Sequence, residues 1–571
     1  MIHTNNKSEI HFKKILIQKK FLTLTLILLI FLTLFFESFG FAMLLPVIEG
    51  AIGSGTDTKL GLYIKEFLQF FEVNYSIENI LIIFVVAIVL KNILIIARDS
   101  LRTYYAYSFK RDAMIGINKS LMEMNYSDFQ KEKHGHLISD TLSATQHATL
   151  FVIQFIEFIT SIFTVIVFVV VMYLTDPTMT IFFIVFGFIF FLIFKLTLHN
   201  YGKSVGMKEV EMNQQATDYL TESVSLMRDF RLNLLEKFQL NRLREKLDNI
   251  VHLEVKWNAL TASIQPLVEI LIILLFASFV FYIVSEDSVE TLRDRIPAIA
   301  LMLVLAQRTF VRASQISRTY ISIVRYFVPF SVVSRYLLND INHGTGTTYI
   351  DFNRKIFFKK ISISSDSKIV IKNSSFSINP GKVTGIVGKS GTGKSSLVDI
   401  LMRLREPNSG SVFIGQKNIN DIDIKLLRRK ISVVNQSLNL RNVSVMENIK
   451  TGNFNATDNE VYKITKDLGI HEFITTLPEG YNTIVGDKGD LISGGQAQRI
   501  LTARALVREP EILILDEFTS ALDKDTEEKI NQHLIEFMRN KTIIIITHRE
   551  STLKYCEEVF SIGNKSIKKI K

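Results

Sequence analysis

Long apolar runs alternate with charged stretches over the first part of the chain. Six of these runs have about the 20 residues, or more, that an α-helix needs to cross a lipid bilayer. We therefore predict a membrane domain over residues 1–335 that is entirely α-helical. Its six helices are expected at about residues 21–45, 80–98, 151–174, 178–198, 260–284 and 296–330.

The polar stretches between these helices differ in length and charge. Stretches 99–148 and 199–258 are long, helical in pattern and free of proline, so each is expected to extend two membrane helices as a hairpin beyond the bilayer. The hairpin tips are predicted near residues 126–131 and 223–228, although ordinary solvated helices would show the same pattern. Lysines precede the first helix, and this places the N-terminus in the cytoplasm by the positive-inside rule.

The later part of the chain shows a different pattern, in which short apolar runs end in polar or charged residues. Residues 336–350 are predicted to be a linker. Helical segments separate the apolar runs, and such an alternation is typical of a parallel α/β sheet. Residues 351–571 are therefore predicted to form an α/β domain whose ligands lie at the carboxyl ends of the strands. Its strands are expected near residues 383–387, 431–436, 512–517 and 543–548.

A glycine-rich turn joins the first of these strands to a predicted helix. Its spacing fits the phosphate-loop pattern G-x-x-x-x-G-K-[ST], in which backbone N–H groups and the start of the helix bind phosphate oxygens. The lysine of the pattern would reach the β- and γ-phosphates of ATP, and the serine hydroxyl would bind Mg²⁺. The sequence thus predicts a P-loop ATPase domain. The predicted binding residues are Gly388, Lys389, Ser390, Gly391, Thr392, Gly393, Lys394, Ser395 and Ser396.

Polar side chains follow three further strands of the predicted sheet. Asp516 is expected to hold Mg²⁺ together with Ser395, and Glu517 is expected to polarise the attacking water. Gln436 would complete the metal shell or sense the metal, and His548 would hold the γ-phosphate and orient the water. Each residue alone is more often structural than functional, but their order along the chain favours one ATP-hydrolysing site.

A second glycine turn opens another predicted helix further along the chain. Its residues Ser493, Gly494, Gly495 and Gln496 can also bind phosphate through backbone N–H groups at a helix start. Serving the same nucleotide within one chain would duplicate the phosphate loop. A second copy of the domain, facing head to tail, would instead supply this turn across an interface, and ATP would hold the two copies together.

The composition of the chain limits the classes of protein to which it could belong. The chain has 571 residues, a formal net charge of +10 and 48% hydrophobic residues, which together fit a membrane half joined to a soluble half. Lysine and arginine flank the apolar helices, as in cytoplasmic loops, so the positive charge does not indicate nucleic-acid binding. The single cysteine, Cys556, excludes an intrachain disulfide. A soluble ATPase that acts on nucleic acid and an ATP-gated channel are rival hypotheses.

These motifs, in this order, resemble the nucleotide-binding domain of ATP-binding cassette (ABC) transporters. The resemblance includes the signature Ser493–Gln496, preceded by Ile492 where leucine is usual, and the Ser-Ala-Leu-Asp loop, whose Asp523 it assigns to the nucleotide site. Six membrane helices ahead of one such domain are similar to an exporter half-transporter. The resemblance implies a homodimer, or a dimer with a related half-transporter, that alternates between inward- and outward-open states and hydrolyses ATP at two sites.

One departure from the family concerns the nucleobase. The family usually places an aromatic ring against the adenine near the start of the domain, and the corresponding positions here are Ser364 and Ser365. Base stacking would be weaker in this chain, or Phe357 or Phe358 would supply the ring. The phosphate chemistry does not depend on this difference.

Ionisable residues at predicted membrane depth bear on the substrate. Such groups are costly in lipid and usually face a cavity or a partner. Arg98 and Arg308 would bind an anionic group such as a phosphate if their helices line one cavity, and snorkelling to the bilayer surface is the alternative. For Glu37, Glu157 and Glu269, a helix–helix hydrogen bond and a substrate contact are both open.

The first helix and these arginines are similar to those of bacterial lipid-linked oligosaccharide flippases. The segment 37–46 carries the similarity in the helix, whereas Gln265 stands where a third arginine would be expected. The resemblance implies a polyprenyl-pyrophosphate oligosaccharide as substrate, moved across the inner membrane by a chain whose N-terminus and nucleotide-binding domain are cytoplasmic. An exporter of peptides or hydrophobic compounds with the same ATPase domain is the alternative.

Overall fold

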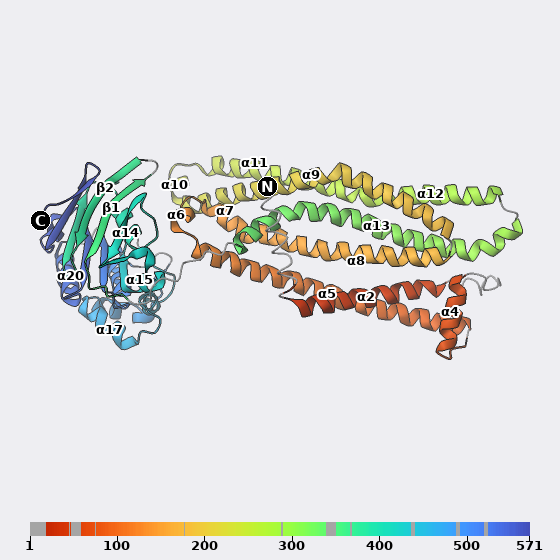
Figure 1. The fold of residues 1–571 in the computed structure, drawn as a ribbon, viewed down its shortest axis with the longest axis horizontal. Coiled ribbons are helices and arrows are strands. Elements are labelled where there is room, and N and C mark those ends of the chain that lie inside the picture. Colours follow the sequence, from red (N-terminus) through yellow and green to blue (C-terminus); the bar gives the residue numbers. More distant parts are fainter. Residues whose placement is uncertain are drawn as a thin grey trace. The chain divides into compact units, whose positions relative to one another are not determined.

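The computed structural model divides the chain into two compact units. One unit comprises Met1–Met124 and Phe129–Ile341, and the other comprises Asn125–Asp128 and Asn342–Lys571. The first unit is helical, and the second is built on β-sheets (Figure 1). The residues described are 17, 19–44, 46, 59–74, 76–175, 177–286, 289–338, 350–365, 368–435, 440–486, 492–518 and 524–571.

The first unit is a bundle of long helices. These helices are α2 (Lys20–Ala42), α5 (Ile77–Glu123), α8 (Thr145–Thr175), α9 (Pro177–Ser225), α11 (Glu236–Ala262), α12 (Ile264–Glu286) and α13 (Val289–Leu337). Its shorter helices are α4 (Lys59–Phe70), α7 (His134–Ser139) and α10 (Met227–Leu232). The short helix α6 (Tyr126–Phe129) falls mostly within Asn125–Asp128, which belongs to the second unit. Helix α13 packs along α8 and α9, α2 packs along α5, and α11 is separated from α12 by Ser263 alone (Figure 1).

Several helices extend beyond the apolar runs that predict them. Helix α5 continues to Glu123 and α9 continues to Ser225, so much of both long polar stretches is a direct continuation of an apolar helix. Helix α4 lies within residues 46–79, for which the hydrophobic pattern predicts no helix. Helix α13 ends at Leu337, and residues 339–349 of the predicted linker lie outside the described part of the chain.

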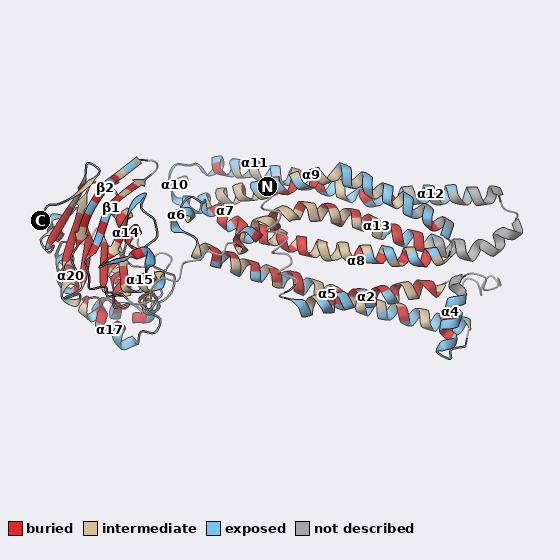
Figure 2. Cartoon of the chain, viewed as in Figure 1, coloured by how far each residue is buried: buried red, intermediate tan, exposed pale blue. Residues whose placement is uncertain are grey.

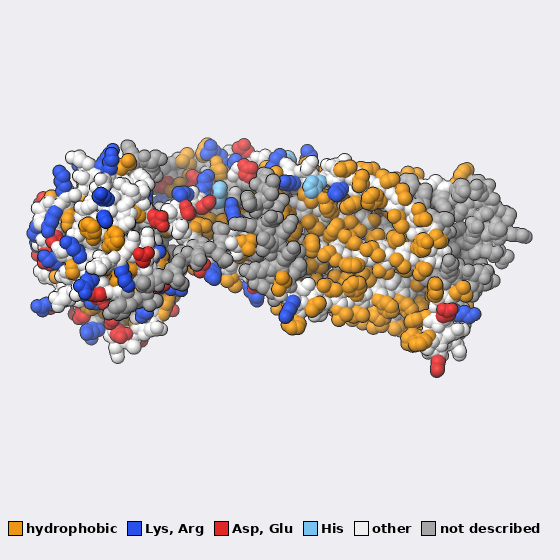
Figure 3. All heavy atoms as spheres, viewed as in Figure 1, with side chains coloured by type: hydrophobic (Ala, Val, Ile, Leu, Met, Phe, Trp, Pro, Cys, Tyr) orange, Lys and Arg blue, Asp and Glu red, His pale blue; other side chains and the backbone are white. Residues whose placement is uncertain are grey.

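The outer surface of this bundle is apolar over a broad band (Figure 3). Exposed leucine, isoleucine, valine and phenylalanine side chains follow α2, α5, α9 and α12, where a water-soluble bundle would carry charges. Within the described residues, three segments are long and apolar enough to cross a membrane: Lys20–Ala42, Ile77–Glu123 and His134–Thr175. The first unit therefore has the surface of a bundle that faces lipid.

A buried network of charges joins four helices of the bundle. Arg325 of α13 donates from Nε to Glu209 Oε2 of α9 at 2.8 Å and also pairs with Glu254 of α11. His147 of α8 lies 3.0 Å from the other carboxylate oxygen of Glu209, and the Arg325 guanidinium lies over the ring of Trp257. Arg325 and Glu209 are 3% and 4% exposed. Basic residues of α8 and α13 therefore meet acidic residues of α9 and α11.

A π-helical turn, Asp140–Ala144, lies between α7 and α8. Asp140 is buried, and its carboxylate accepts hydrogen bonds from Gln214 of α9 at 2.8 Å and from Tyr336 of α13 at 2.9 Å. Such turns are rare inside helices and are frequent at functional positions. Here the turn places one carboxylate against two neighbouring helices.

The second unit contains two β-sheets. The larger has six strands in the order β10-β9-β3-β8-β7-β6, and all neighbours except β10 and β9 are parallel. The smaller has four antiparallel strands in the order β2-β1-β4-β5. The strands are β1 (Ile356–Ser365), β2 (Lys368–Ile378), β3 (Val383–Gly388), β4 (Ser409–Ile414), β5 (Lys417–Asn418), β6 (Ile431–Val434), β7 (Ile512–Asp516), β8 (Thr542–Ile546), β9 (Glu558–Gly563) and β10 (Ser566–Lys569).

Strands β3, β7 and β8 are buried on both faces, as their continuous apolar sequences predict (Figure 2). Strand β8 lies between β3 and β7 and is parallel to both, so the carboxyl ends of all three meet at one edge. The surrounding helices are α14 (Lys394–Leu401), α15 (Ile424–Lys430), α16 (Val445–Lys450), α17 (Asp458–Asp467), α18 (His471–Thr476), α19 (Gly494–Leu506), α20 (Lys524–Phe537) and α21 (Glu550–Leu553).

Candidate nucleotide site

The glycine turn after β3 has the backbone geometry of a phosphate-binding loop. Gly391 and Gly393 have φ values of +79° and +96°, in the left-handed region that favours glycine. Gly393 is also the N-cap of α14, so the loop ends directly at a helix start. Thr392 Oγ1 donates to the backbone oxygen of Lys389 at 2.8 Å and closes the turn. The N–H groups of the loop and of the first helical turn can therefore bind an anion together.

The side chain of Lys394 folds back onto this loop. Its Nζ donates to the backbone oxygens of Gly388 at 2.8 Å and Lys389 at 3.3 Å, and the residue is only 8% exposed. Nζ also lies 3.8 Å from Glu517 Oε1. The ammonium group thus places a positive charge at the loop, where the β- and γ-phosphates of a nucleotide would lie.

Ser395 links α14 to the end of β7. Its hydroxyl donates to Asp516 Oδ2 at 3.0 Å. Burial raises the pKa of Asp516, and the charge of Glu517 raises it further, whereas the Ser395 hydrogen bond and Lys394 oppose the shift. A hydroxyl and a carboxylate held this close are oxygen ligands of the kind that Mg²⁺ takes. The residues present therefore fit a magnesium ion, whose charge would compensate the buried carboxylate.

Glu517 follows Asp516 at the end of β7 with a strained backbone. Its φ is +48°, which is uncommon for a residue with a side chain, and its N–H donates to the backbone oxygen of Ile546 in β8 at 2.9 Å. Its Oε1 lies 3.6 Å from His548 Nδ1 and 3.8 Å from Lys394 Nζ. The carboxylate therefore lies between the cation of the phosphate loop and the histidine that follows β8.

The signature turn is a capped helix start. The hydroxyl of Ser493, the N-cap of α19, accepts from the Gln496 N–H at 3.3 Å, and the Gln496 side chain accepts from the Ser493 N–H at 2.8 Å. Gly494 and Gly495 then form the first helical turn, where N–H groups have no intrahelical partner. Within the described residues, no hydrogen bond or ion pair joins this turn to the phosphate loop. The structure therefore does not bring the signature to the phosphate loop of its own chain.

Two predicted site residues, Gln436 and Asp523, lie outside the described residues. The strand before Gln436, β6, ends at Val434, and α20 begins at Lys524, directly after Asp523. The roles predicted for the two residues therefore stay predictions.

The side chains considered for the nucleobase differ in accessibility. The N–H and hydroxyl of Ser364 both donate to Asn408 Oδ1, at 2.7 and 2.8 Å. Phe358 is 2% exposed, and its ring stacks on Phe376 with the centroids 4.4 Å apart, so it cannot receive a base. Phe357 is 37% exposed and is therefore the one of the two phenylalanines with accessible ring surface.

The predicted substrate arginines lie on α5 and α13. Arg98 is buried, and its Nε donates a hydrogen bond to Asp99 Oδ1 at 3.0 Å. The Arg308 guanidinium lies 5.3 Å from the ring centroid of Phe41. Lys91 of α5 lies 5.9 Å from the same centroid and pairs with Glu37 at 3.5 Å. Within the described residues, no hydrogen bond or ion pair joins Arg98 to Arg308. Cations of α5 and α13 nevertheless approach one ring of α2.

One turn further along each helix, two other arginines meet at a carboxylate. Arg102 of α5 and Arg312 of α13 both pair with Glu157 of α8, the latter at 3.8 Å. The hydrophobic pattern gives no sign of Arg102 except its spacing from Arg98, which places both on one helix face. Glu269 of α12 is exposed.

A strand, a glycine loop and a helix, beside strands that end in an acid pair and a histidine, define a P-loop nucleotide-binding domain. Residues 371–520 match the ABC transporter family. The second unit therefore contains an ABC transporter ATPase domain over residues 371–520, and such a domain binds ATP.

Curated relatives match part of this chain. The chain is 40% identical over 224 residues to the ATP-dependent lipid A-core flippase of Acinetobacter baylyi. The aligned region covers 39% of each protein. The chain is 29% identical over 379 residues to the ATP-dependent lipid A-core flippase of Syntrophus aciditrophicus, which covers 64% of this chain and 62% of that protein. It is 38% identical over 239 residues to multidrug resistance protein 1 of Entamoeba histolytica, covering 41% of this chain and 18% of that protein. Each match spans less than two thirds of the relative's length.

A solved structure extends the likeness to the membrane helices. A bacterial Atm1-family ABC exporter with ATP bound matches 96% of this chain and 94% of its own, with a TM-score of 0.81 and 20% sequence identity. The chain therefore has the fold of an ABC exporter half-transporter. The predicted fold class, a six-helix membrane domain followed by an α/β P-loop ATPase domain, is confirmed.

Proposed function

We propose that two copies of this chain, or one copy and a related half-transporter, form an ATP-driven exporter or flippase of an anionic amphiphile. The observation that supports the ATPase most directly is the convergence of Lys394 and His548 on Glu517, at 3.8 and 3.6 Å. The hydrogen-bonded pair of Ser395 and Asp516 lies beside them. These groups are the ones that phosphoryl transfer to water requires.

Hydrolysis follows from these positions. The loop N–H groups and Lys394 bind the β- and γ-phosphates, so the ammonium group exchanges its backbone carbonyl partners for phosphate oxygens. Ser395 and Asp516 would hold Mg²⁺, which would supply charge neutralisation at the phosphates. Glu517 accepts a hydrogen bond from the attacking water and polarises it. His548 contacts the γ-phosphate and keeps the Glu517 carboxylate oriented.

The separation of the signature turn from the phosphate loop supports a dimer. A second copy, facing head to tail, would bring its Gly494 and Gly495 N–H groups to the γ-phosphate held by the first. Both nucleotides would then lie between the copies, and ATP would draw the two ATPase domains together. Hydrolysis would remove the γ-phosphate and let them separate.

The arginines of α5 and α13 support an anionic substrate group. Arg98 and Arg102 share one face of α5, Arg308 and Arg312 are one turn apart on α13, and Glu157 bridges the two helices. Cations outnumber carboxylates in this group of side chains. One guanidinium group can donate two parallel hydrogen bonds to the oxygens of a phosphate. We therefore propose a polyprenyl-pyrophosphate oligosaccharide as the substrate, and the names of the lipid A-core flippase relatives agree with a lipid-linked substrate.

An exporter of peptides or hydrophobic compounds is the second candidate. The multidrug resistance relative favours it by name. Aromatic rings of α2, such as Phe39 and Phe41, would provide an apolar surface near the same cations.

The proposal also assigns the chain a membrane and an orientation. The apolar bundle would lie in the inner (plasma) membrane, and the ATPase domain and the N-terminus would lie in the cytoplasm, where ATP is available. Lys19 and Lys20 at the start of α2 support this orientation.

Purified protein reconstituted in lipid vesicles tests the proposal. Polyprenyl-pyrophosphate sugars should stimulate ATP hydrolysis and cross the bilayer only with ATP, whereas amphipathic peptides should do neither. The reverse result would favour the second candidate. Transport of neither class with ATP would contradict both.

A further inference from the structure

Asn448 of α16 is a fully buried asparagine, 0% exposed, that holds the preceding segment of chain. Its Nδ2 donates to the backbone oxygens of Arg441 at 2.9 Å, Val443 at 3.2 Å and Ser444 at 3.1 Å. Its Oδ1 accepts from the Arg441 N–H at 3.0 Å. A buried amide with this many partners fixes residues 441–444 in one conformation, because losing any partner leaves a polar group unsatisfied.

The same asparagine also binds α19. Arg504 donates from one terminal nitrogen to Asn448 Oδ1 at 2.6 Å and from Nε to the Asn448 backbone oxygen at 2.9 Å. Close by, Gly452 packs directly on the α19 backbone, since a Cβ at this position would lie 2.1 Å from the Arg504 carbonyl oxygen. Side-chain and backbone contacts therefore join α16 to α19 near the end of α19.

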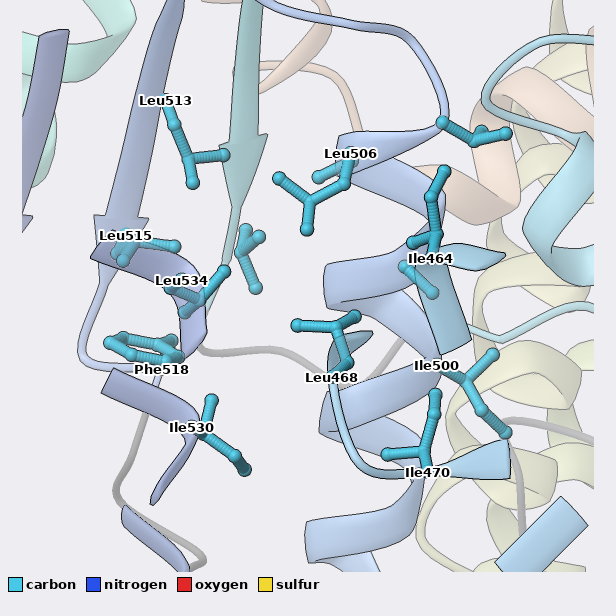
Figure 4. Packing of buried hydrophobic residues seen from close by; sticks show 14 of the residues in the cluster. Ile464, Leu468, Ile470, Ile500, Leu506, Leu513, Leu515, Phe518, Ile530 and Leu534 are labelled. Carbon is cyan, nitrogen blue, oxygen red and sulfur yellow. The ribbon is translucent and has the colours of Figure 1, made fainter. Parts of the chain in front are cut away.

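Helix α19 connects this joint to the signature turn. Its N-cap is Ser493, and Arg504 lies about 16 Å further along the helix axis at a rise of about 1.5 Å per residue. Its buried residues Ile500 and Leu506 pack in the same apolar cluster as Leu468, which directly follows α17, and Leu513 of β7 (Figure 4). Because α19 is short and packed against this cluster, we expect a shift at Arg504 to carry Ser493 with it.

The segment held by Asn448 follows β6 in the sequence, and β6 lies beside β7 in the larger sheet. Strand β6 runs beside β7 in parallel, with Val434 opposite Leu515, one residue before Asp516. Residues 441–444 follow β6 along the chain and enter α16 at Val445. Asn448 therefore joins residues 441–444 to α19, the helix that begins with the signature.

We propose that Asn448 is a positioning residue that sets the signature turn relative to the phosphate loop of its own chain, acting through Arg504 and α19. The inference rests on the proposed function, in which each signature completes the ATP site of the other copy. In a two-fold dimer both sites close together only if this spacing is the same and correct in each chain. Asn448 then acts on closure of the dimer around ATP without touching the nucleotide.

Comparing ATP occlusion with ADP binding in the full-length protein distinguishes this positioning role from a purely structural one. In Glu517→Gln protein, adding Asn448→Ala should raise the ATP concentration needed for occlusion about tenfold or more, the size of an ordinary coupling between sites. ADP binding, which needs only the phosphate loop, should change by less than about twofold on the same scale. Retained radiolabelled ATP after rapid gel filtration gives the first quantity, and fluorescent ADP titration gives the second.

Variants of Arg504, alone and combined with Asn448→Ala, provide a double-mutant cycle, and further variants serve as controls. Arg504→Ala leaves the asparagine bonds to residues 441–444 in place and should impair occlusion as Asn448→Ala does, with little further loss in the double variant. Arg504→Lys keeps the charge but not the paired geometry, and should restore only part of the effect. Asn379→Ala removes a side-chain hydrogen bond to Glu558, away from α16 and α19, and should leave occlusion unchanged.

Three results would contradict the inference. Normal occlusion by both Asn448→Ala and Arg504→Ala would show that the joint does not position the signature. Equal loss of ADP and ATP binding would show a collapse of the domain instead of a change in closure. Failure of the Glu517→Gln parent to occlude ATP at all would refute the proposed dimeric ATPase, and with it this role for Asn448.

Discussion

The hydroxyl of Ser395 donates a hydrogen bond to Asp516 Oδ2 at 3.0 Å, so the phosphate-loop helix and the end of β7 meet at a buried carboxylate. Burial raises the pKa of Asp516 above its ordinary value of 3.8. Between the unfolded and the folded pKa, the folded protein binds more protons, so the free energy of unfolding falls as pH rises through that window. Above it, the ionised carboxylate opposes folding unless a cation compensates it.

Asp516→Asn should therefore raise the melting temperature of nucleotide-free protein at neutral pH while abolishing ATP hydrolysis. The gain should vanish below about pH 4, where the wild-type carboxylate is protonated in both states. Thermal scans over a pH series, with phosphate release in parallel, measure both effects. Asp423→Asn keeps its capping bond to α15 and should change neither. A lower melting temperature for Asp516→Asn at pH 7 would contradict the argument.

Glu517→Gln should lower the turnover of ATP by roughly 10²- to 10⁴-fold, the usual contribution of a general base. ATP should still bind, because the loop and Lys394 are unchanged. Phosphate release measures the turnover, and nucleotide titration measures ATP binding. Glu511→Gln is the matched control, since Glu511 pairs with Lys430 at 3.3 Å at the other end of β7 and should tolerate the change. Turnover at the wild-type rate in Glu517→Gln would remove this residue from the mechanism.

The double variant Arg98→Ala and Arg308→Ala should lose ATP-dependent movement of the lipid-linked sugar but keep basal ATP hydrolysis within about twofold, because neither arginine lies in the ATPase domain. Flipping in vesicles and ATPase assays on the same preparation measure both. Arg244→Ala, at an exposed position of α11, serves as the control. If flipping survives in the double variant, the pyrophosphate hypothesis is wrong.

Arg325→Met should destabilise the bundle strongly, because it leaves Glu209 and Glu254 buried or half-buried without their cation. Removing one partner of a buried ion pair costs about 3–5 kcal/mol. The melting temperature in detergent should fall accordingly, whereas Arg335→Met, at an exposed position on α13, should have little effect. Adding Glu209→Leu should recover part of the loss, since both charges are then gone. No recovery would mean that the ion pair is not the cause.

The phosphate chemistry could be predicted from the sequence because short spacings determine it. The loop from Gly388 to Ser395 is contiguous, so its pattern alone specifies the turn, the lysine and the hydroxyl. Asp516 and His548 are far apart in sequence, but each ends an apolar strand, and parallel strands place their carboxyl ends together. The structure adds the distances and shows that Lys394 and His548 share one carboxylate oxygen.

Other site features could not be predicted, because they depend on tertiary partners. Asn448 is a polar residue in a short helix, and nothing in the local pattern shows that its partner is Arg504. In β1, alternation indicates that one of Phe357 and Phe358 faces inward, but only the pairing of β1 with β2, which brings Phe376 beside Phe358, decides which. Arg102 likewise depends on Glu157 of a different helix.

The π turn at Asp140–Ala144 makes the orientation of α7 depend on chain length. A π turn holds about one residue more than an α turn. Each residue of an α-helix turns the chain by about 100° around the helix axis. Deleting one residue here would let a continuous α-helix form, and α7 would turn by that angle about α8, carrying the carboxylate away from Gln214 and Tyr336. The loss of a single codon in this stretch would therefore redirect α7 without altering one side chain of its surface.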